Sequence, residues 1–134
     1  MITLTSVYTH RGAVLTLYDL LLERTPEQSI SHKKMPTMEE HNKFFRSKPY
    51  LAWYLVQSDG VNVGTVYLTA AREIGIFIFA RHQGQGYGEA AVRAIMEKHP
   101  GDGRFIANIN PANDPSHNLF EKLGFKMIQH TYAR

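Results

Sequence analysis

The chain has 134 residues, a length typical of one domain with its own hydrophobic core. Its net charge is +3 with histidine counted as neutral, which suits an anionic ligand and is too small to indicate a nucleic-acid-binding protein. The absence of cysteine excludes disulfides, a cysteine nucleophile and a thiolate metal site.

The remaining composition predicts an ordinary soluble domain. No apolar run approaches the roughly twenty residues of a membrane span, and the first residues do not resemble a signal peptide. None of the histidines lies in an H-E-x-x-H pattern, so we expect no metal site. We therefore expect residues 1–134 to form a single cytoplasmic domain without a membrane or nucleic-acid partner.

Hydrophobic periodicity predicts strands and helices along the whole chain. In order we expect a strand, two helices, three strands, a helix, a strand, a helix and a last strand, at residues 2–8, 10–24, 38–48, 51–56, 63–70, 73–80, 89–99, 105–109, 114–123 and 125–132. Thr9 is the expected N-cap of the first helix, and Thr37 with Glu40 forms a capping box for the second. Residues 25–36 predict a polar loop, and Ser58-Asp59-Gly60 predicts a hairpin turn. Antiparallel hairpins with one late crossover indicate an α+β fold.

The stretch Gln83-Gly84-Gln85-Gly86-Tyr87-Gly88 joins a predicted strand to a predicted helix. The first N–H groups of a helix have no intrahelical partner, and the helix dipole adds partial positive charge there. Glycines let the backbone approach an anion closely because they have no Cβ. The stretch therefore predicts a phosphate site, although a plain strand–turn–helix junction would have the same pattern.

Three phosphate-binding patterns compete for this stretch. Gly86 and Gly88 begin a match to the dinucleotide pattern G-x-G-x-x-A, but the next strand does not end in the acid that a ribose requires. The P-loop pattern needs Gly-Lys-Ser/Thr, which is absent. The third pattern, Q/R-x-x-G-x-G/A, is filled by Gln83, Gly86 and Gly88 and resembles the acetyl-CoA pyrophosphate loop of the GNAT N-acetyltransferases. Arg81, Gly84 and Gly86 also fit it two residues earlier, and we prefer the later register.

The motif Asn113-x-x-Ser116-x-x-Leu119-Phe120-x-x-x-Gly124-Phe125 carries the second resemblance. It is similar to the GNAT pattern N-x-x-A/S-x-x-L-Y-x-x-x-G-F, and the predicted order of elements resembles that fold over nearly the whole chain. The resemblance implies the GNAT acyl-CoA N-acyltransferase fold, a mixed and mostly antiparallel sheet flanked by helices. Too few residues follow Phe125 for the family's last hairpin, so we expect its final strand to be missing and a homodimer to cover the exposed edge.

The resemblance also implies a reaction in which a neutral primary amine attacks the thioester of acetyl-CoA directly, with no metal. Glu73, in Glu73-Ile74-Gly75-Ile76, is the candidate base; a strand-edge glutamate paired with Arg72 or with solvent is the alternative. A backbone N–H near Phe79 would hold the oxyanion. The implied acetyl-CoA contacts are Ile78 and Phe79 for pantetheine, Asn113 and Ser116 on its far side, and Gln83, Gly84, Gln85, Gly86, Tyr87 and Gly88 for the pyrophosphate.

Two questions stay open at this point. Phe120 stands where many members of the family carry a tyrosine proposed as the general acid, so the group that protonates the CoA thiolate is undefined. Residues 38–41 and 54–56 with Gly64 resemble amino-sugar-nucleotide acetyltransferases, whereas residues 73–88 with Asn113 and Ser116 equally resemble ribosomal-protein N-terminal acetyltransferases. Another small amine is a third acceptor, and a non-catalytic acyl-CoA-binding domain is a different class of function.

Overall fold

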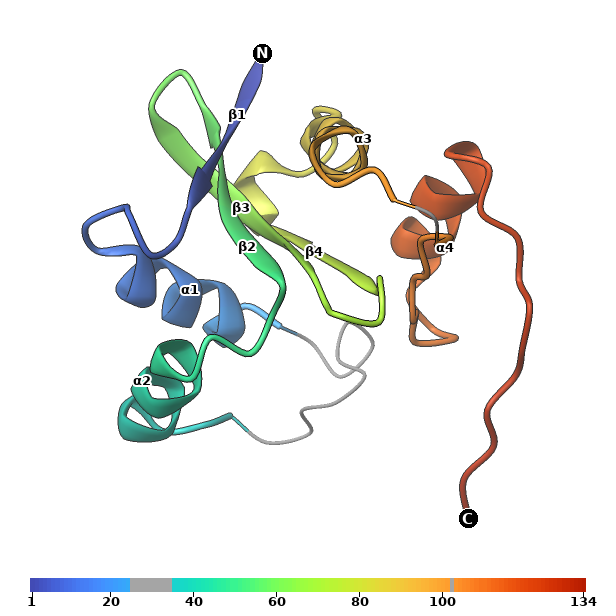
Figure 1. The fold of residues 1–134 in the computed structure, drawn as a ribbon, viewed down its shortest axis with the longest axis horizontal. Coiled ribbons are helices and arrows are strands. Elements are labelled where there is room, and N and C mark those ends of the chain that lie inside the picture. The colour runs from blue at the N-terminus through green and yellow to red at the C-terminus, as the bar shows by residue number, and fades with distance from the viewer. Residues whose placement is uncertain (25–34, 102) are drawn as a thin grey trace.

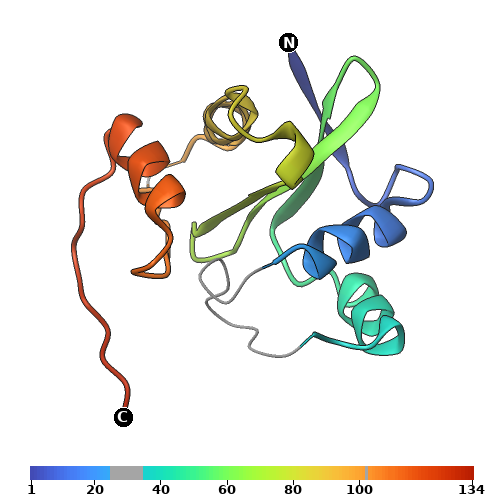
Figure 2. The same cartoon turned by 180° about the vertical axis from the view of Figure 1, so that it is seen from behind.

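The computed structural model describes residues 1–24, 35–101 and 103–134, which form a four-stranded sheet with helices on both faces (Figures 1 and 2). The strands are β1 (Ile2–Ser6), β2 (Ala52–Ser58), β3 (Val61–Leu68) and β4 (Ile74–Ile78). The helices are α1 (Ala13–Leu22), α2 (Met38–Arg46), the short 3-10 helix η1 (Ala80–His82), α3 (Tyr87–Lys98) and α4 (Asp114–Lys122). This arrangement confirms the predicted α+β class. Most of the loop predicted at residues 25–36 lies outside the described residues.

Neighbouring strands are all antiparallel, in the spatial order β1-β2-β3-β4. The β2–β3 hairpin closes through Asp59 and Gly60, whose φ angles of 51° and 79° place both in the left-handed region. Two such residues match the right-handed twist of the flanking strands, so the predicted turn is confirmed. β4 lies at the edge of this sheet, and that edge positions the candidate site.

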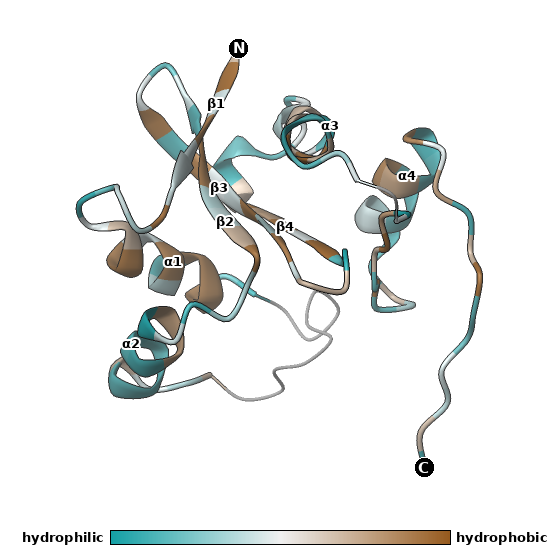
Figure 3. Ribbon diagram, in the orientation of Figure 1, coloured by the Kyte–Doolittle hydropathy of each residue, from teal (hydrophilic) through white to brown (hydrophobic). Residues whose placement is uncertain are grey.

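Apolar side chains bury both faces of the sheet. On one face α3 covers a buried cluster that includes Val56, Val66, Leu68, Ile74, Val92 and Ile95. On the other face α1 and α2 cover a second cluster that includes Val7, Leu17, Leu20, Trp53, Leu55 and Phe79. Figure 3 shows the apolar residues gathered along the strands, whereas the ribbon of α2 is largely hydrophilic. α4 lies beside α3, on the far side from α1 and α2 (Figure 1).

One predicted helix start is confirmed and the other is wrong. Thr37 Oγ1 accepts the N–H of Glu40 at 3.1 Å, and Glu40 Oε1 accepts the N–H of Thr37 at 2.8 Å, so the capping box of α2 forms. The N-cap of α1 is Gly12, with φ 81°, and not Thr9. The Thr9 hydroxyl donates instead to the carbonyl of Ser6 at 3.2 Å, because the chain turns after β1 before the helix begins.

Two predicted strands do not form within the described residues. Residues 105–109 contribute a single parallel bridge, between Glu73 and Ile106, and then leave β4. Residues 125–132 have no strand pairing, and the end of the chain runs away from the sheet (Figure 1). Met127, Ile128 and Tyr132 are 67%, 61% and 89% exposed, so alternation alone does not make a strand when no partner strand lies alongside. Self-association over the sheet edge stays a prediction.

Candidate active site

The outer edge of β4 has unpaired backbone groups. The N–H of Phe79 donates to Val63 at 2.9 Å. Hydrogen-bonded pairs alternate in an antiparallel ladder, so Ile76 and Ile78 direct their N–H and C=O groups to the opposite, outer side. At the start of β4 this outer side is paired, because the N–H of Ile74 donates to Ile106 at 2.8 Å. Beyond that bridge, no described residue bonds the N–H groups of Ile76 and Ile78.

The glycine stretch begins where this edge ends. η1 follows β4 directly, and the side chain of Gln83 then turns back to donate from Nε2 to the carbonyl of Ile78 at 3.0 Å. Gly84 and Gly86 have φ angles of 79° and 83°, values that most side chains disfavour, and Gly86 is the N-cap of α3. Within the described chain, the backbone N–H groups of residues 84–88 donate no hydrogen bond. Exposed donors at a helix N-terminus are the arrangement that binds anions in other proteins, and anion binding at residues 84–88 stays a prediction.

The start of α3, the end of β4 and α4 meet at Gly88. A Cβ at this position would lie 2.9 Å from Leu119 Cδ1 and 3.8 Å from Ile78 Cγ1. Asn113 is the N-cap of α4, and its Oδ1 accepts the N–H of Ser116 at 3.3 Å. Leu119 of α4 is therefore held near Gly88 and the end of β4, and Ser116 lies one helical turn before Leu119 on the same helix.

The N–H of Phe79, near which the sequence analysis placed the oxyanion donor, is not open. Phe79 is only 4% exposed and its N–H is bonded within the sheet, as described above. The N–H groups that stay open on β4 are those of Ile76 and Ile78. Sequence reasoning placed the donor near Phe79 because strand register, which decides the direction of each N–H, cannot be derived from one strand alone.

Glu73 lies one residue before β4 and is held by two neighbours. Its carboxylate accepts the hydroxyl of Thr69 at 3.2 Å and the amide of Asn108. Because side chains alternate along a strand, Glu73 shares its face of the sheet with Phe77. That face is the one that α1 and α2 cover.

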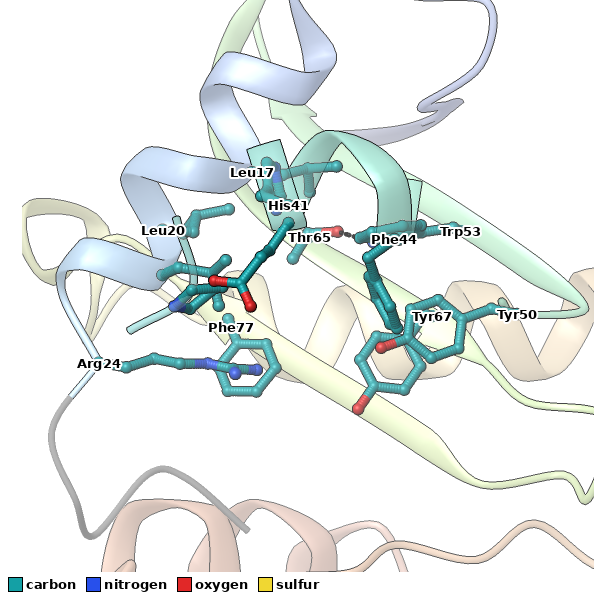
Figure 4. A pocket seen from close by; sticks show the side chains of 13 residues that line it. Leu17, Leu20, Arg24, His41, Phe44, Tyr50, Trp53, Thr65, Tyr67 and Phe77 are labelled. Atoms are coloured by element: carbon teal, nitrogen blue, oxygen red, sulfur yellow. Dashed lines mark hydrogen bonds between the residues drawn. The ribbon is translucent and has the colours of Figure 1, made fainter. Parts of the chain in front are cut away.

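A cavity of about 230 Å³ lies on this face, between the sheet and the two helices (Figure 4). Its lining combines residues of α1, α2, β2, β3 and β4 with others from the connecting segments: Leu17, Leu20, Leu21, Arg24, Pro36, Glu40, His41, Phe44, Tyr50, Trp53, Thr65, Tyr67 and Phe77. The rings of Tyr50 and Tyr67 stack with centroids 3.9 Å apart, and Trp53 Nε1 donates to Thr65 Oγ1 at 3.0 Å. The sequence analysis missed this cavity, because its lining residues come from segments that are distant in the sequence.

Burial shifts the titration of the cavity's polar side chains. It raises the pKa of Tyr50 well above its ordinary value, and the neighbouring Tyr67 adds to this shift. Burial also raises the pKa of Tyr67, which nearby Arg24 lowers and nearby Glu73 raises. Burial lowers the pKa of the Arg24 guanidinium. Tyr67 therefore interacts electrostatically with both Arg24 and Glu73.

Phe120, the departure from the GNAT pattern, is a core residue. It is 4% exposed and packs edge-on against Phe125, with ring centroids 5.1 Å apart. Within the described ranges, no three histidine, cysteine or acidic side chains gather as metal ligands. Within the same ranges, no helix is long and apolar enough to cross a bilayer.

The family model for "Acetyltransferase (GNAT) family" matches residues 14–125. The chain belongs to the GNAT acetyltransferase family. This confirms the resemblance on which the sequence analysis relied, and the sheet and helices described above are those of a GNAT fold. No curated protein sequence matches the chain.

Solved structures share the fold at low sequence identity. A spermidine/spermine N-acetyltransferase from Vibrio cholerae is 17% identical with a TM-score of 0.76, over 96% of this chain and 81% of that one. A putative acetyltransferase from Salmonella typhimurium, solved with acetyl-CoA, is 16% identical with a TM-score of 0.69, over 93% and 78%. A ribosomal-protein-alanine N-acetyltransferase from Brucella melitensis is 16% identical with a TM-score of 0.70, over 94% and 84%.

Proposed function

We propose that this GNAT protein transfers the acetyl group of acetyl-CoA to the primary amine of a small molecule, within a ternary complex. One observation carries the proposal. The backbone N–H groups of residues 84–88 donate no hydrogen bond within the described chain, and they follow an open strand edge. Polyphosphate binds such N–H groups, and an amide-containing arm binds such an edge as an added strand does.

The acyl donor is accordingly assigned to the outer side of β4. Its pyrophosphate is assigned to Gly84, Gln85, Gly86, Tyr87 and Gly88, with Gln83 alongside. Its pantetheine amides pair with the open backbone groups of Ile76 and the open N–H of Ile78, while Asn113 and Ser116 line the other side of the arm. Because the N–H of Phe79 is bonded to Val63, we assign the oxyanion donor to Ile76 or Ile78.

The acceptor is assigned to the cavity on the face of the sheet that α1 and α2 cover, beside the open edge of β4. Its volume of about 230 Å³ is below the usual range of about 300–1,000 Å³ for ligand pockets, which favours a small molecule over a folded protein partner. Glu73 lies on the same face and its charge acts on Tyr67, a lining residue. We assign Glu73 the role of base, directly or through a water molecule.

The proposed step conserves atoms and charge. The amine nitrogen forms a bond to the acetyl carbonyl carbon, the carbon–sulfur bond breaks, and the amine proton passes to Glu73. The CoA sulfur departs as a thiolate, and since a thiol has a pKa of about 8.5, it leaves without a side-chain acid. A buried phenylalanine at position 120 is compatible with this route.

A panel of primary amines tests the proposed function. Purified protein with acetyl-CoA is offered polyamines, amino sugars, amino acids and peptides with free N-termini, and release of free CoA is followed over time. Turnover with a small amine, confirmed by the mass of the acetylated product, is the expected result. Turnover confined to peptides would establish an N-terminal acetyltransferase instead, and binding of acetyl-CoA without any turnover would establish a non-catalytic acyl-CoA-binding domain.

A further inference from the structure

Arg24 is a cation built into the wall of the acceptor cavity. It follows Glu23, the C-cap of α1, and its guanidinium lies over the ring of Phe77, with Cζ 3.7 Å from the ring centroid (Figure 4). Stacking on an aromatic face fixes the plane of a guanidinium and leaves its N–H edge available. Phe77 belongs to β4, the strand that also carries the proposed acyl-donor groups, so Arg24 lies over the same strand as those groups.

Within the described residues, Arg24 has no acidic partner. The two ion pairs of that part of the chain, Arg93 and Lys122 with Glu89, lie on α3 and α4. The acid that lines the same cavity, Glu40, already takes part in the capping box of α2. A guanidinium that loses water on burial needs an anion or strong acceptors to offset the loss.

A second charged group, Glu73, lies on the same face of the sheet, outside the residues that line the cavity. Glu73 and Phe77 lie four residues apart along the strand, so their side chains point to the same face. The ring of Tyr67 lies between them, over Gly75, since a Cβ at position 75 would overlap its Cζ and hydroxyl. A ligand whose carboxylate binds Arg24 would therefore have its remaining atoms on the face that Glu73 shares.

We propose that Arg24 binds a carboxylate of the acceptor, so that the substrate is a small amino acid whose amine receives the acetyl group. This proposal rests on the proposed function and names its substrate class. A guanidinium fork matches a carboxylate through two parallel hydrogen bonds. Among the lining residues Arg24 supplies one full positive charge, which balances the single charge of a carboxylate better than the double negative charge of a phosphate ester.

Calorimetry with matched ligand pairs tests Arg24 without depending on turnover. The protein is saturated with CoA and titrated with L-phenylalanine and phenethylamine, L-leucine and isoamylamine, and γ-aminobutyrate and propylamine. The members of each pair differ by the carboxylate alone. Arg24→Gln removes the charge, Arg24→Lys keeps it without the fork, and Arg11→Gln makes the same change of charge at the other, exposed end of α1. Circular dichroism confirms that each variant is folded.

The wild-type protein is expected to bind at least one amino acid about 10- to 100-fold more tightly than its matched amine, in line with one charge-assisted pair. Arg24→Gln should abolish this difference, Arg24→Lys should keep part of it, and Arg11→Gln should keep all of it. Equal binding within every wild-type pair, or a difference that survives Arg24→Gln, overturns the proposal. Titration of CoA itself is the separate check on the proposed function: if CoA does not bind, that function fails, and the pairs titrated without CoA still decide the role of Arg24.

Discussion

The two sides of β4 are built in different ways. On the outer side, the glycine stretch uses backbone N–H groups of consecutive residues, and Gly84 and Gly86 are exposed. On the inner side, the cavity is built from side chains of two helices and three strands, with stacked rings and a half-buried guanidinium. Substitutions on the outer side should therefore change ligand affinity with little effect on folding, whereas substitutions on the inner side should change both.

Glu73→Gln gives the largest effect on turnover, because it removes the proposed base and keeps the size of the side chain. We expect kcat to fall about 100-fold, a usual loss for general base catalysis. The affinity for acetyl-CoA should not change, since Glu73 lies on the inner face. Steady-state kinetics and calorimetry measure the two quantities. Glu97→Gln, the same change at an exposed position near the end of α3, is the matched control. Wild-type turnover in Glu73→Gln would assign proton removal to water or backbone.

Gly75→Ala tests whether the inner side couples binding to folding. A Cβ at position 75 would lie 2.0 Å from Tyr67 Cζ, so the Tyr67 ring must move and its stack on Tyr50 must break. We expect the free energy of unfolding to fall by about 1–3 kcal/mol, the usual cost of overpacking, and the acceptor KM to change while acetyl-CoA affinity is kept. Urea denaturation measures the first quantity. The double variant Gly75→Ala with Tyr67→Leu should recover part of the stability; no recovery would mean that the ring is not the obstacle.

The smallest effect is expected at His99, which lies outside both regions. Its Nε2 is 2.7 Å from the hydroxyl of Tyr54, and burial lowers its pKa, with help from the charges of Lys98 and Arg72. The folded state therefore disfavours the protonated ring. The contribution of His99 to the free energy of unfolding should be fully present above the unfolded pKa of about 6.5 and should decline as the pH falls below that value. Urea unfolding at a series of pH values should show a shallower decline for His99→Gln. An identical decline would place the acid sensitivity in another group.

The same contrast explains what the sequence could predict. The glycine stretch, the capping box at Thr37 and the turn at Asp59 depend on neighbours in the chain, and all three form as predicted. The Phe79 N–H, the cavity and the strand at residues 125–132 depend on pairing or packing with distant segments, and the sequence analysis misplaced or missed them. The residues that line the cavity extend from Leu17 to Phe77, and no local pattern indicates that they meet.

The capacity of the backbone at residues 84–88 to bind the pyrophosphate of acetyl-CoA is the central claim, and one pair of variants tests it directly. Position 86 has space for a side chain, since a Cβ there would have no atom within 4 Å, and its left-handed conformation is one that asparagine and aspartate tolerate. Gly86→Asn and Gly86→Asp therefore differ in charge alone. A like charge at about 4 Å from an anion costs roughly 1–4 kcal/mol. Calorimetry with acetyl-CoA should show Gly86→Asp binding about 100-fold more weakly than Gly86→Asn, and equal affinity in the two folded variants would contradict the assignment.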